Sequence, residues 1–410
     1  MFIGNGHPHF NMREKIAVWS SYRAREDCVG RPNVRVMRLK VARLPLHASG
    51  DMQHFVTFAH YRSCYDSFMK ARHWVKRLRI SLACVFALVA GLGVWVVVQN
   101  DFAVREVQVT ITGPKHPLKA VLALPTEGEG RRGLVVFAHG DGEADASRDG
   151  FYRPIWEAFA RAGYASLSWN KPGIDGAPGN WLHQSMSDRS EEVEAALDWA
   201  KKRPEIDPNR LGLWGISQGG WVLPKVAGER IDVRFMILVG AAVNWLRQGE
   251  YNLRTELREQ GAPEAELDSE LRRRAAQIRL LEKGVGYDQY VASGLDNPPM
   301  SKDRWGFVLK NFRADVTDQL PKVRTSTLLV LGDLDRNVDV KETEAAYRAG
   351  IPRDLLTVAN LPNGSHNAVK NELDNPDSLW AVITAVAAPR SLYVPGYLDM
   401  LTEYAKKHGR

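Results

Sequence analysis

The stretch Leu211–Gly220, which reads LGLWGISQGG, constrains the fold of this chain more than any other. Its apolar first part, Leu211–Trp214, predicts a strand that leads directly into a Gly-x-Ser-x-Gly pattern. This is the pattern of a nucleophile elbow, in which a sharp strand-to-helix turn lifts one serine to its tip. The turn is strained and needs residues without bulk beside the serine, and Gly215 and Gly219 supply them. The pattern therefore predicts Ser217 as a nucleophile.

A serine hydroxyl is a poor nucleophile near neutral pH unless a base lies beside it. His366 follows the last predicted strand, and of the 11 histidines it is the one placed to meet Ser217. An acidic loop after the preceding strand can orient the base. We predict Asp335 for this role, with Asp333 and Asp339 as alternatives, because loops are rich in aspartate for turn chemistry alone. The order Ser217, Asp335, His366 differs from the orders of the chymotrypsin and subtilisin folds.

Acyl transfer also needs backbone N–H groups aimed at the developing oxyanion. One is expected from Gln218, which follows the nucleophile, and the other from Asp141, in the loop after the apolar run Leu134–Ala138. Gly140 and Gly142 allow close approach of this loop.

Three aromatic side chains lie in or near these segments and are expected to support the site or to line it. His139 is predicted to hold the loop by hydrogen bonds without taking part in chemistry. Trp181 and Trp221 could line an acyl pocket, although such residues more often pack in a core or under a lid.

Helical and strand patterns alternate from about residue 102 onward. This alternation predicts an α/β fold with a mostly parallel sheet covered by helices on both faces. The predicted strands are Val107–Ile111, Lys119–Leu124, Leu134–Ala138, Ala165–Trp169, Leu211–Trp214, Phe235–Val239, Thr327–Leu331 and Leu355–Leu361. The predicted helices are Trp156–Ala162, Ser185–Arg203 with a cap near Ser187, Gly219–Glu229, Val340–Ala349 and Tyr397–His408.

Residues 240–326 are too long for a simple crossover between two strands. Apolar residues recur there at helical spacing, and Glu270 and Arg274 are placed to pair at i, i+4. We predict an inserted helical lid at about residues 243–318; the alternative is a helical hairpin with no role at the site.

The N-terminal part differs in charge from the remainder. Residues 1–79 carry 15 basic and 5 acidic residues, whereas the whole chain has a net charge of +7, so the rest is slightly acidic. No basic patch in the main domain suggests nucleic acid. We expect residues 1–79 to be disordered, and residues 1–68 to be an over-extended start, because Met69 opens a signal-like segment.

Ile80–Val98 is an uncharged run of 19 residues. As a helix it would be about 28 Å long, close to the hydrocarbon thickness of a bilayer. The alternative is a buried core helix. Five basic residues precede the run and a lone Arg105 follows it, which predicts a cytoplasmic N-terminus and an extracytoplasmic domain over residues 102–410. No cleavage pattern is evident near Gln99, so a retained signal anchor is favoured over a cleaved signal.

The three cysteines, Cys28, Cys64 and Cys84, all precede the main domain. That domain therefore has no disulfide framework, cysteine nucleophile or cysteine metal site. No metal or organic cofactor is expected.

Residues from about 104 to 410 resemble the α/β-hydrolase superfamily. The similarity is greatest to dienelactone-hydrolase-like and prolyl-oligopeptidase-like serine esterases, including acyl thioesterase-type members. The matching pieces are Phe137-Ala138-His139-Gly140, Lys171-Pro172-Gly173, Gly215–Trp221, Gly332-x-x-Asp335 and Ser365-His366. Two positions depart from the pattern: the loop Asn170–Gly173 replaces the Asp-x-Arg-Gly of relatives, and Asp141 puts a carboxylate beside the expected oxyanion.

The resemblance implies a Ser–His–Asp hydrolase that cleaves small esters, thioesters or amides through an acyl-enzyme. A peptidase and a non-catalytic, membrane-anchored binding protein of the same fold are the alternatives.

Overall fold

The structure, a computed structural model, describes residues 53–375 and 377–409, with side chains from Met69 onward. It divides into two units, one ending at Val98 and the other beginning at Gln99. The predictions for residues 1–52, including most of the over-extended start, lie outside the described residues.

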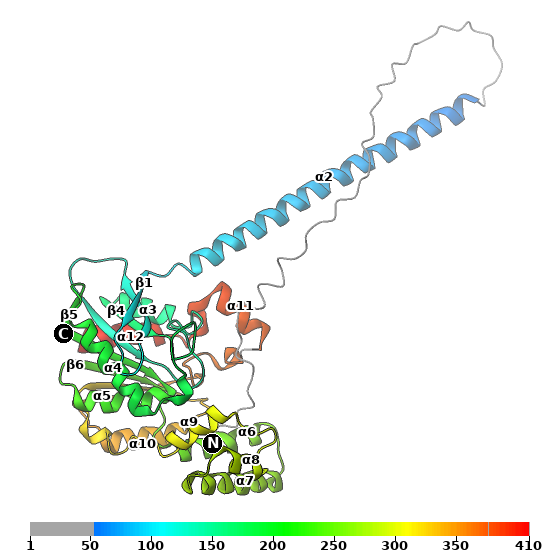
Figure 1. Ribbon diagram of the computed structural model, residues 1–410. Helices are drawn as coiled ribbons and strands as arrows, with labels where there is room; N and C mark the ends of the chain where they lie inside the picture. The colour runs from blue at the N-terminus through cyan, green and yellow to red at the C-terminus, as the bar shows by residue number, and fades with distance from the viewer. Residues whose placement is uncertain (1–52, 376, 410) are drawn as a thin grey trace. The chain divides into compact units, whose positions relative to one another are not determined.

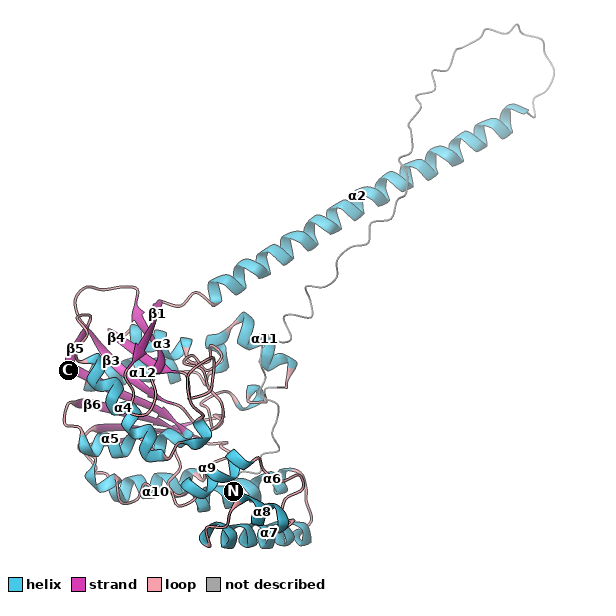
Figure 2. Cartoon of the chain, viewed as in Figure 1, coloured by secondary structure: helices cyan, strands magenta, loops and turns pink. Residues whose placement is uncertain are grey.

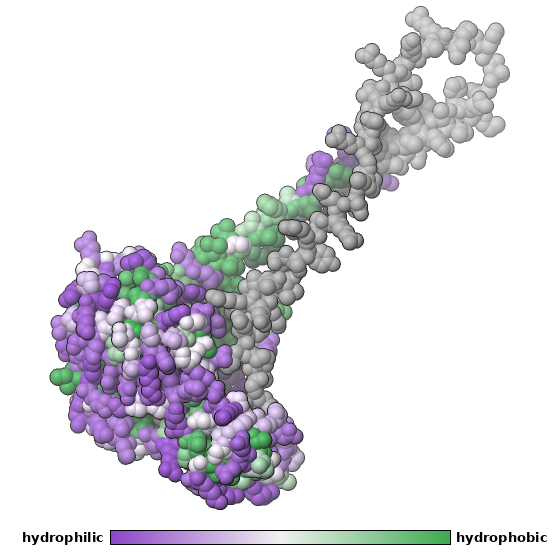
Figure 3. Space-filling model, viewed as in Figure 1, coloured by the Kyte–Doolittle hydropathy of each residue, from purple (hydrophilic) through white to green (hydrophobic). Residues whose placement is uncertain are grey.

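The first unit contains helix α2, Gln53–Gln99. Within it, Met69–Gln99 is long and apolar enough to cross a membrane, and a window of 18 residues in it has a mean hydropathy of 2.5. Its apolar side chains are exposed and form the hydrophobic stretch visible in Figure 3. The expectation of disorder up to residue 79 is wrong for residues 53–79, which are helical. No glycine or proline occurs between Gln53 and Ala90, so nothing stops the helix from propagating back from the apolar run.

The second unit is built on one eight-stranded sheet in the order β1-β2-β4-β3-β5-β6-β7-β8. Figures 1 and 2 show this sheet among its helices. β1 pairs antiparallel with β2 and β2 antiparallel with β4, and all other neighbours are parallel. The strands are β1 Val104–Ile111, β2 Leu118–Pro125, β3 Arg132–Ala138, β4 Tyr164–Trp169, β5 Ile206–Ile216, β6 Val233–Val239, β7 Ser326–Gly332 and β8 Leu356–Leu361.

Helices cover both faces of the sheet, as predicted. Alternate residues of a strand enter different cores: on β3, Val136 joins one hydrophobic cluster and Phe137 the other. The first cluster lies under α4 (Met186–Ala200), α5 (Leu223–Glu229) and α10 (Val340–Gly350). The second lies under α3 (Arg153–Ala160) and α12 (Tyr397–His408). Both layers are visible in Figure 1.

The observed elements differ from the predicted ones in several places, three of which are at β5, α4 and the segment after the elbow. β5 starts at Ile206, five residues before the predicted strand Leu211–Trp214. Helix α4 is capped by Ser185 rather than near Ser187, because Ser185 and Asp188 form a reciprocal capping box. The helix after the elbow is divided into a short 3₁₀ segment, η3 (Ser217–Trp221), and α5, since Pro224 can occupy only the first turn of a helix.

Four helices occupy the long connection between β6 and β7, and Figure 1 shows them grouped beside one end of the sheet. They are α6 Trp245–Glu259, α7 Glu264–Glu282, α8 Tyr287–Ala292 and α9 Lys302–Asn311. The predicted Glu270–Arg274 pair is wrong. Glu270 pairs with Arg273, whereas Arg274 is buried and donates to the carbonyl of Leu246 at the start of α6.

One helix was not predicted. Between the His366 loop and α12, the chain forms the short 3₁₀ turn η5 (Asn371–Leu373), helix α11 (Leu379–Ala387) and the 3₁₀ turn η6 (Pro389–Leu392).

Candidate active site

Ser217 stands at the sharp turn that the sequence predicts. It directly follows β5 and has a φ of +53°, a strained conformation for a residue with a side chain. The turn also needs its glycines: a Cβ on Gly215 would come within 2.7 Å of Leu223, and one on Gly219 within 2.9 Å of the carbonyl oxygen of Ala138. Ser217 is half-buried.

His366 and Asp335 form a buried pair. The imidazole Nδ1 lies 2.8 Å from the Asp335 carboxylate, and both side chains are almost inaccessible to solvent. Burial lowers the pKa of His366, but the charge and hydrogen bond of Asp335 outweigh this effect and raise it. A carboxylate on Nδ1 favours the neutral tautomer with an unprotonated Nε2, which is the form that a general base needs.

The two other aspartates of this loop, Asp333 and Asp339, have surroundings different from those of Asp335. Asp333 is exposed. Asp339 caps α10 by accepting from the backbone N–H groups of Lys341 and Glu342. Asp335 also accepts from the backbone N–H groups of Asn337 and Val338, which fixes its carboxylate against the histidine.

The histidine and the serine share one edge of the sheet. His366 packs on Gly240, the residue after β6, since a Cβ at that position would lie 2.5 Å from its carbonyl oxygen and 2.9 Å from its Nδ1. β6 pairs with β5 up to Ile216, the residue before Ser217. The serine and the histidine are thus brought together at neighbouring strand ends, which lie about 5 Å apart. The described residues show no hydrogen bond between them.

The loop after β3 forms the other side of the serine. β3 and β5 pair as far as Ala138 and Gly215, and a Cβ on Gly140 would lie 3.2 Å from the Cβ of Ser217. His139 holds the loop, as predicted: its ring nitrogens bond the Tyr152 hydroxyl at 3.0 Å and the Trp169 carbonyl at 2.7 Å. Burial and the charge of Lys171 lower the pKa of His139, so the ring is neutral.

Lys171 is a site residue that sequence reasoning missed. Its ammonium group is buried and donates to the carbonyl oxygens of Gly140 (2.7 Å) and Gly142 (2.6 Å). It also lies 4.8 Å from the centre of the Trp181 ring. Burial and the charge of Arg189 lower its pKa. Lys171 thus holds the loop that contains the predicted oxyanion donor, and its position in the unusual Asn170–Gly173 loop was the one available signal.

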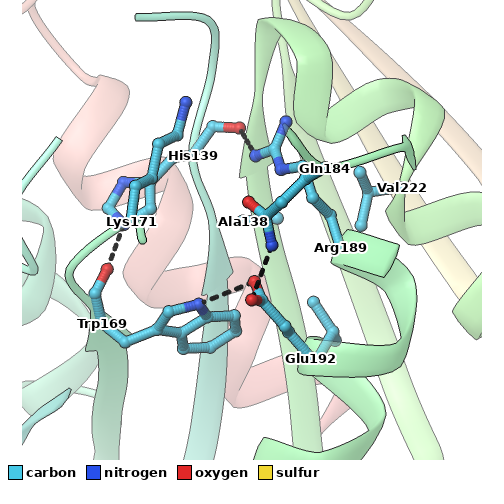
Figure 4. A pocket seen from close by; sticks show the side chains of 9 residues that line it. Ala138, His139, Trp169, Lys171, Gln184, Arg189, Glu192 and Val222 are labelled. Atoms are coloured by element: carbon cyan, nitrogen blue, oxygen red, sulfur yellow. Dashed lines mark hydrogen bonds between the residues drawn. The ribbon is translucent and has the colours of Figure 1, made fainter. Parts of the chain in front are cut away.

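Arg189 joins the two halves of the predicted oxyanion site. From α4 it donates to the side-chain oxygen of Gln218 at 3.0 Å and to the carbonyl of His139 at 2.5 Å. Figure 4 shows it with Lys171 and Glu192 around a small pocket behind the loop. Glu192 accepts hydrogen bonds from Trp169 and Gln184. Burial lowers the pKa of Arg189, and the negative charges of Glu192 and Asp141 act against this effect. A buried arginine on the inner face of a helix has no signature in local sequence.

Asp141, the predicted oxyanion residue, turns its carboxylate toward the insertion. Arg304 on α9 holds it through two hydrogen bonds of 3.1 and 2.8 Å. Burial raises the pKa of Asp141, but the charge of Arg304, its hydrogen bonds and the charge of Lys171 bring it to about 2. The carboxylate is therefore ionised and paired, which resolves the repulsion that its position suggested.

The two predicted pocket tryptophans pack against the insertion. Trp221 is buried, stacks on Trp245 with ring centres 5.1 Å apart, and donates to the carbonyl of Val243. Trp181 is half-buried and meets Phe307 edge-on at 5.5 Å. Trp221 is part of the hydrophobic core, and a role in substrate binding is still a prediction for both tryptophans.

The fold and the arrangement at its strand ends define an α/β-hydrolase. Residues 129–374, more than half of the chain, match the family model described as serine aminopeptidase, S33. The chain belongs to this family of hydrolases.

Curated relatives match parts of the chain. An uncharacterised 31.7 kDa protein of the traX-finO intergenic region of Escherichia coli is 29% identical over 142 residues, 33% of this chain and 49% of that protein. The chain thus spans about half the length of this relative. The thiohydrolase apmlB of Arthrinium phaeospermum is 22% identical over 285 residues, 66% of this chain and 86% of that protein. Among solved structures, DcsB in complex with its substrate analogue is similar at 15% identity and a TM-score of 0.49, over 74% of this chain and 99% of that chain.

Proposed function

We propose that this hydrolase cleaves carboxylic esters or thioesters through a Ser217–His366–Asp335 triad. The observation that supports the triad most strongly is the 2.8 Å contact between His366 and Asp335, both buried, at the edge of the sheet where Ser217 stands. A hydroxyl at a strained turn, a histidine and an orienting carboxylate form the constellation that activates a serine.

The proposed mechanism follows from these positions. His366 takes the Ser217 proton through Nε2 as Oγ attacks the acyl carbon. The backbone N–H groups of Gln218 and Asp141 stabilise the oxyanion. His366 then protonates the leaving alcohol or thiol, and water attacks the acyl-enzyme with His366 again acting as the base. Asp335 holds the imidazole tautomer and stabilises its positive charge.

Two observations guide the choice of substrate. The relative named a thiohydrolase aligns over most of its length and supports a thioester or ester. The description of the family, serine aminopeptidase, favours an amide as the second candidate. A binding protein without turnover is the third possibility, and it would not need a serine held in a strained conformation.

The remaining parts of the chain have roles that fit this reaction. We propose that α6–α9 act as a lid, because Arg304 of α9 is paired with Asp141 beside Ser217. We also propose that Ile80–Val98 of α2 is a retained anchor with its N-terminus in the cytoplasm. The second unit, which begins at Gln99 and which we call the catalytic unit, would then lie outside the cytoplasm, as the basic residues before the span predict.

Labelling with a fluorophosphonate probe tests the triad. The full chain in detergent would be compared with Ser217→Ala, His366→Ala and, as a matched control, Ser391→Ala at an exposed serine. We expect the wild type and Ser391→Ala to take up the probe and the other two to lose labelling. A folded wild type that takes up no probe would contradict the proposal and favour the binding role.

Turnover of a p-nitrophenyl ester, a thioester and an anilide with the same acyl group would distinguish the substrates. Ester and thioester cleavage without anilide cleavage is the expected result. Faster cleavage of the anilide would support the peptidase candidate instead.

A further inference from the structure

Helix α11 carries an apolar surface that the rest of the catalytic unit does not cover. Its sequence, LWAVITAVA, contains no charged residue. Leu379 and Trp380 are 70% and 71% exposed, and Ile383 and Val386 are each 42% exposed. Because Leu379, Ile383 and Val386 follow helical spacing, they lie on one face of the helix, with Trp380 at its border.

Such exposure is unusual in this unit. Among the described residues from Gln99 onward, the other large apolar side chains with high exposure are isolated: Ile231, Val291 and Leu334. Isolated exposed residues need no explanation, whereas a group on one helix face indicates a surface that is covered in use. The packing partners of α11 are chiefly η5 and η6, on either side of it in the chain, and only Ala381 of the helix is fully buried.

The residues that follow the apolar span are bonded directly to this helix and to the turn after it. The side chain of Asn100 donates to the carbonyl of Val386 at 2.7 Å. Arg390, in η6, donates to the carbonyls of Gln99 (2.6 Å) and Asp101 (2.9 Å). Arg390 is itself held by Glu157 of α3 through hydrogen bonds of 2.6 and 2.8 Å.

If α2 spans a membrane as proposed above, these contacts keep α11 close to the membrane surface. Gln99 is the last residue of α2, so the hydrogen bonds join α11 and η6 to the point where the chain leaves the apolar span. A helix in that position with exposed leucine, isoleucine and valine can bury these side chains at the boundary between headgroups and acyl chains. Tryptophan is enriched at this boundary, and Trp380 is the most exposed side chain of the face.

We propose that the face formed by Leu379, Trp380, Ile383 and Val386 docks on the lipid bilayer beside the anchor. The proposal rests on the membrane anchoring proposed above and is independent of the hydrolase reaction. Docking would hold the catalytic unit against the membrane, with the segment 371–392 joining the docked helix to the His366 loop.

Fluorescence of single-cysteine proteins in phosphatidylcholine nanodiscs tests the docking. The full chain with Cys28→Ala, Cys64→Ala and Cys84→Ala would carry either Leu379→Cys or Ile231→Cys, each labelled with an environment-sensitive NBD group. Ile231 is 99% exposed in the turn before β6 and serves as the matched control. A third protein keeps only Cys84, which lies within the span and reports insertion of α2. Nitroxide groups on the lipid acyl chains quench labels that lie in the bilayer.

We expect the labels at Cys84 and at position 379 to show blue-shifted emission and quenching by the nitroxide lipid, and the label at position 231 to show neither. Quenching at Cys84 with a water-like, unquenched label at position 379 would overturn the proposal. Blue-shifted emission at position 379 without lipid quenching would also overturn it, because a protein surface would then cover the helix. An unquenched Cys84 would mean that the anchoring has failed, and the docking proposal with it, whatever the outcome of the probe labelling of Ser217.

Discussion

Gly240 offers a direct test of the geometry around His366. It follows β6 with a φ of +54°, and a Cβ there would lie 2.5 Å from the His366 carbonyl oxygen and 2.9 Å from its Nδ1. Gly240→Ala therefore combines two costs. The left-handed conformation costs a residue with a side chain about 1–2 kcal/mol, and overpacking at a buried position costs about 1–3 kcal/mol more. We expect the free energy of unfolding to fall by about 2–5 kcal/mol.

The same substitution should also reduce catalysis. The new methyl group cannot fit unless the His366 backbone and ring move, and a displacement of about 1 Å at a catalytic group can lower the rate ~10²-fold. Stability would be measured by urea unfolding of the full chain in detergent, followed by tryptophan fluorescence, and activity by ester turnover at saturating substrate.

Gly163→Ala is the matched control. Gly163 has a φ of +78°, but a Cβ added there would have its nearest heavy-atom neighbour, Nη2 of Arg210, 3.9 Å away. This variant should lose only the conformational term of about 1–2 kcal/mol and keep normal turnover. Equal stability losses in the two variants, with turnover intact in Gly240→Ala, would refute the placement of His366 on the end of β6.

Three further substitutions test the site. In the wild type, burial lowers the pKa of His366, but the charge and hydrogen bond of Asp335 raise it above the ordinary histidine value, and we expect activity to be lost as the pH falls through this raised pKa. Asp335→Asn should lower kcat ~10⁴-fold and move the acid limb of the pH–rate profile to lower pH. The control, Asp333→Asn, should change neither. An acid limb that stays in place in Asp335→Asn would argue against the pairing of Asp335 with His366. Lys171→Met should lower kcat ~10²-fold with little effect on KM, because the loop after β3 loses two hydrogen bonds. Lys119→Met, at an exposed lysine, is its control. Similar kcat values in the two variants would contradict the role of Lys171 in holding this loop. Arg304→Gln should lower kcat about tenfold, because it leaves the Asp141 carboxylate unpaired. Adding Asp141→Asn removes that charge and should restore kcat. A double variant as slow as Arg304→Gln would instead indicate that the substitution disrupts the lid.

The sequence alone determined the elements whose signals are local. The glycines around Ser217 predict its turn because few side chains fit there, and the structure gives this serine a φ of +53°. Alternating helical and strand patterns predicted a mostly parallel sheet with helices on both faces, since hydrophobic periodicity reflects how each element is buried. The chain order of serine, aspartate and histidine narrowed the site to the loops after three strands.

Only the tertiary structure decided which side chains meet. It placed Asp335 on His366 and used Asp339 as a helix cap, although the two residues lie in the same acidic loop. It also buried Lys171 and Arg189 around the loop after β3, and bonded the residues after the span to α11 and η6. The physical reason is that these contacts join segments far apart in the chain. The energies of these contacts depend on the distance between the groups and on their burial in the folded state. Neither quantity can be read from residue type and spacing in the sequence.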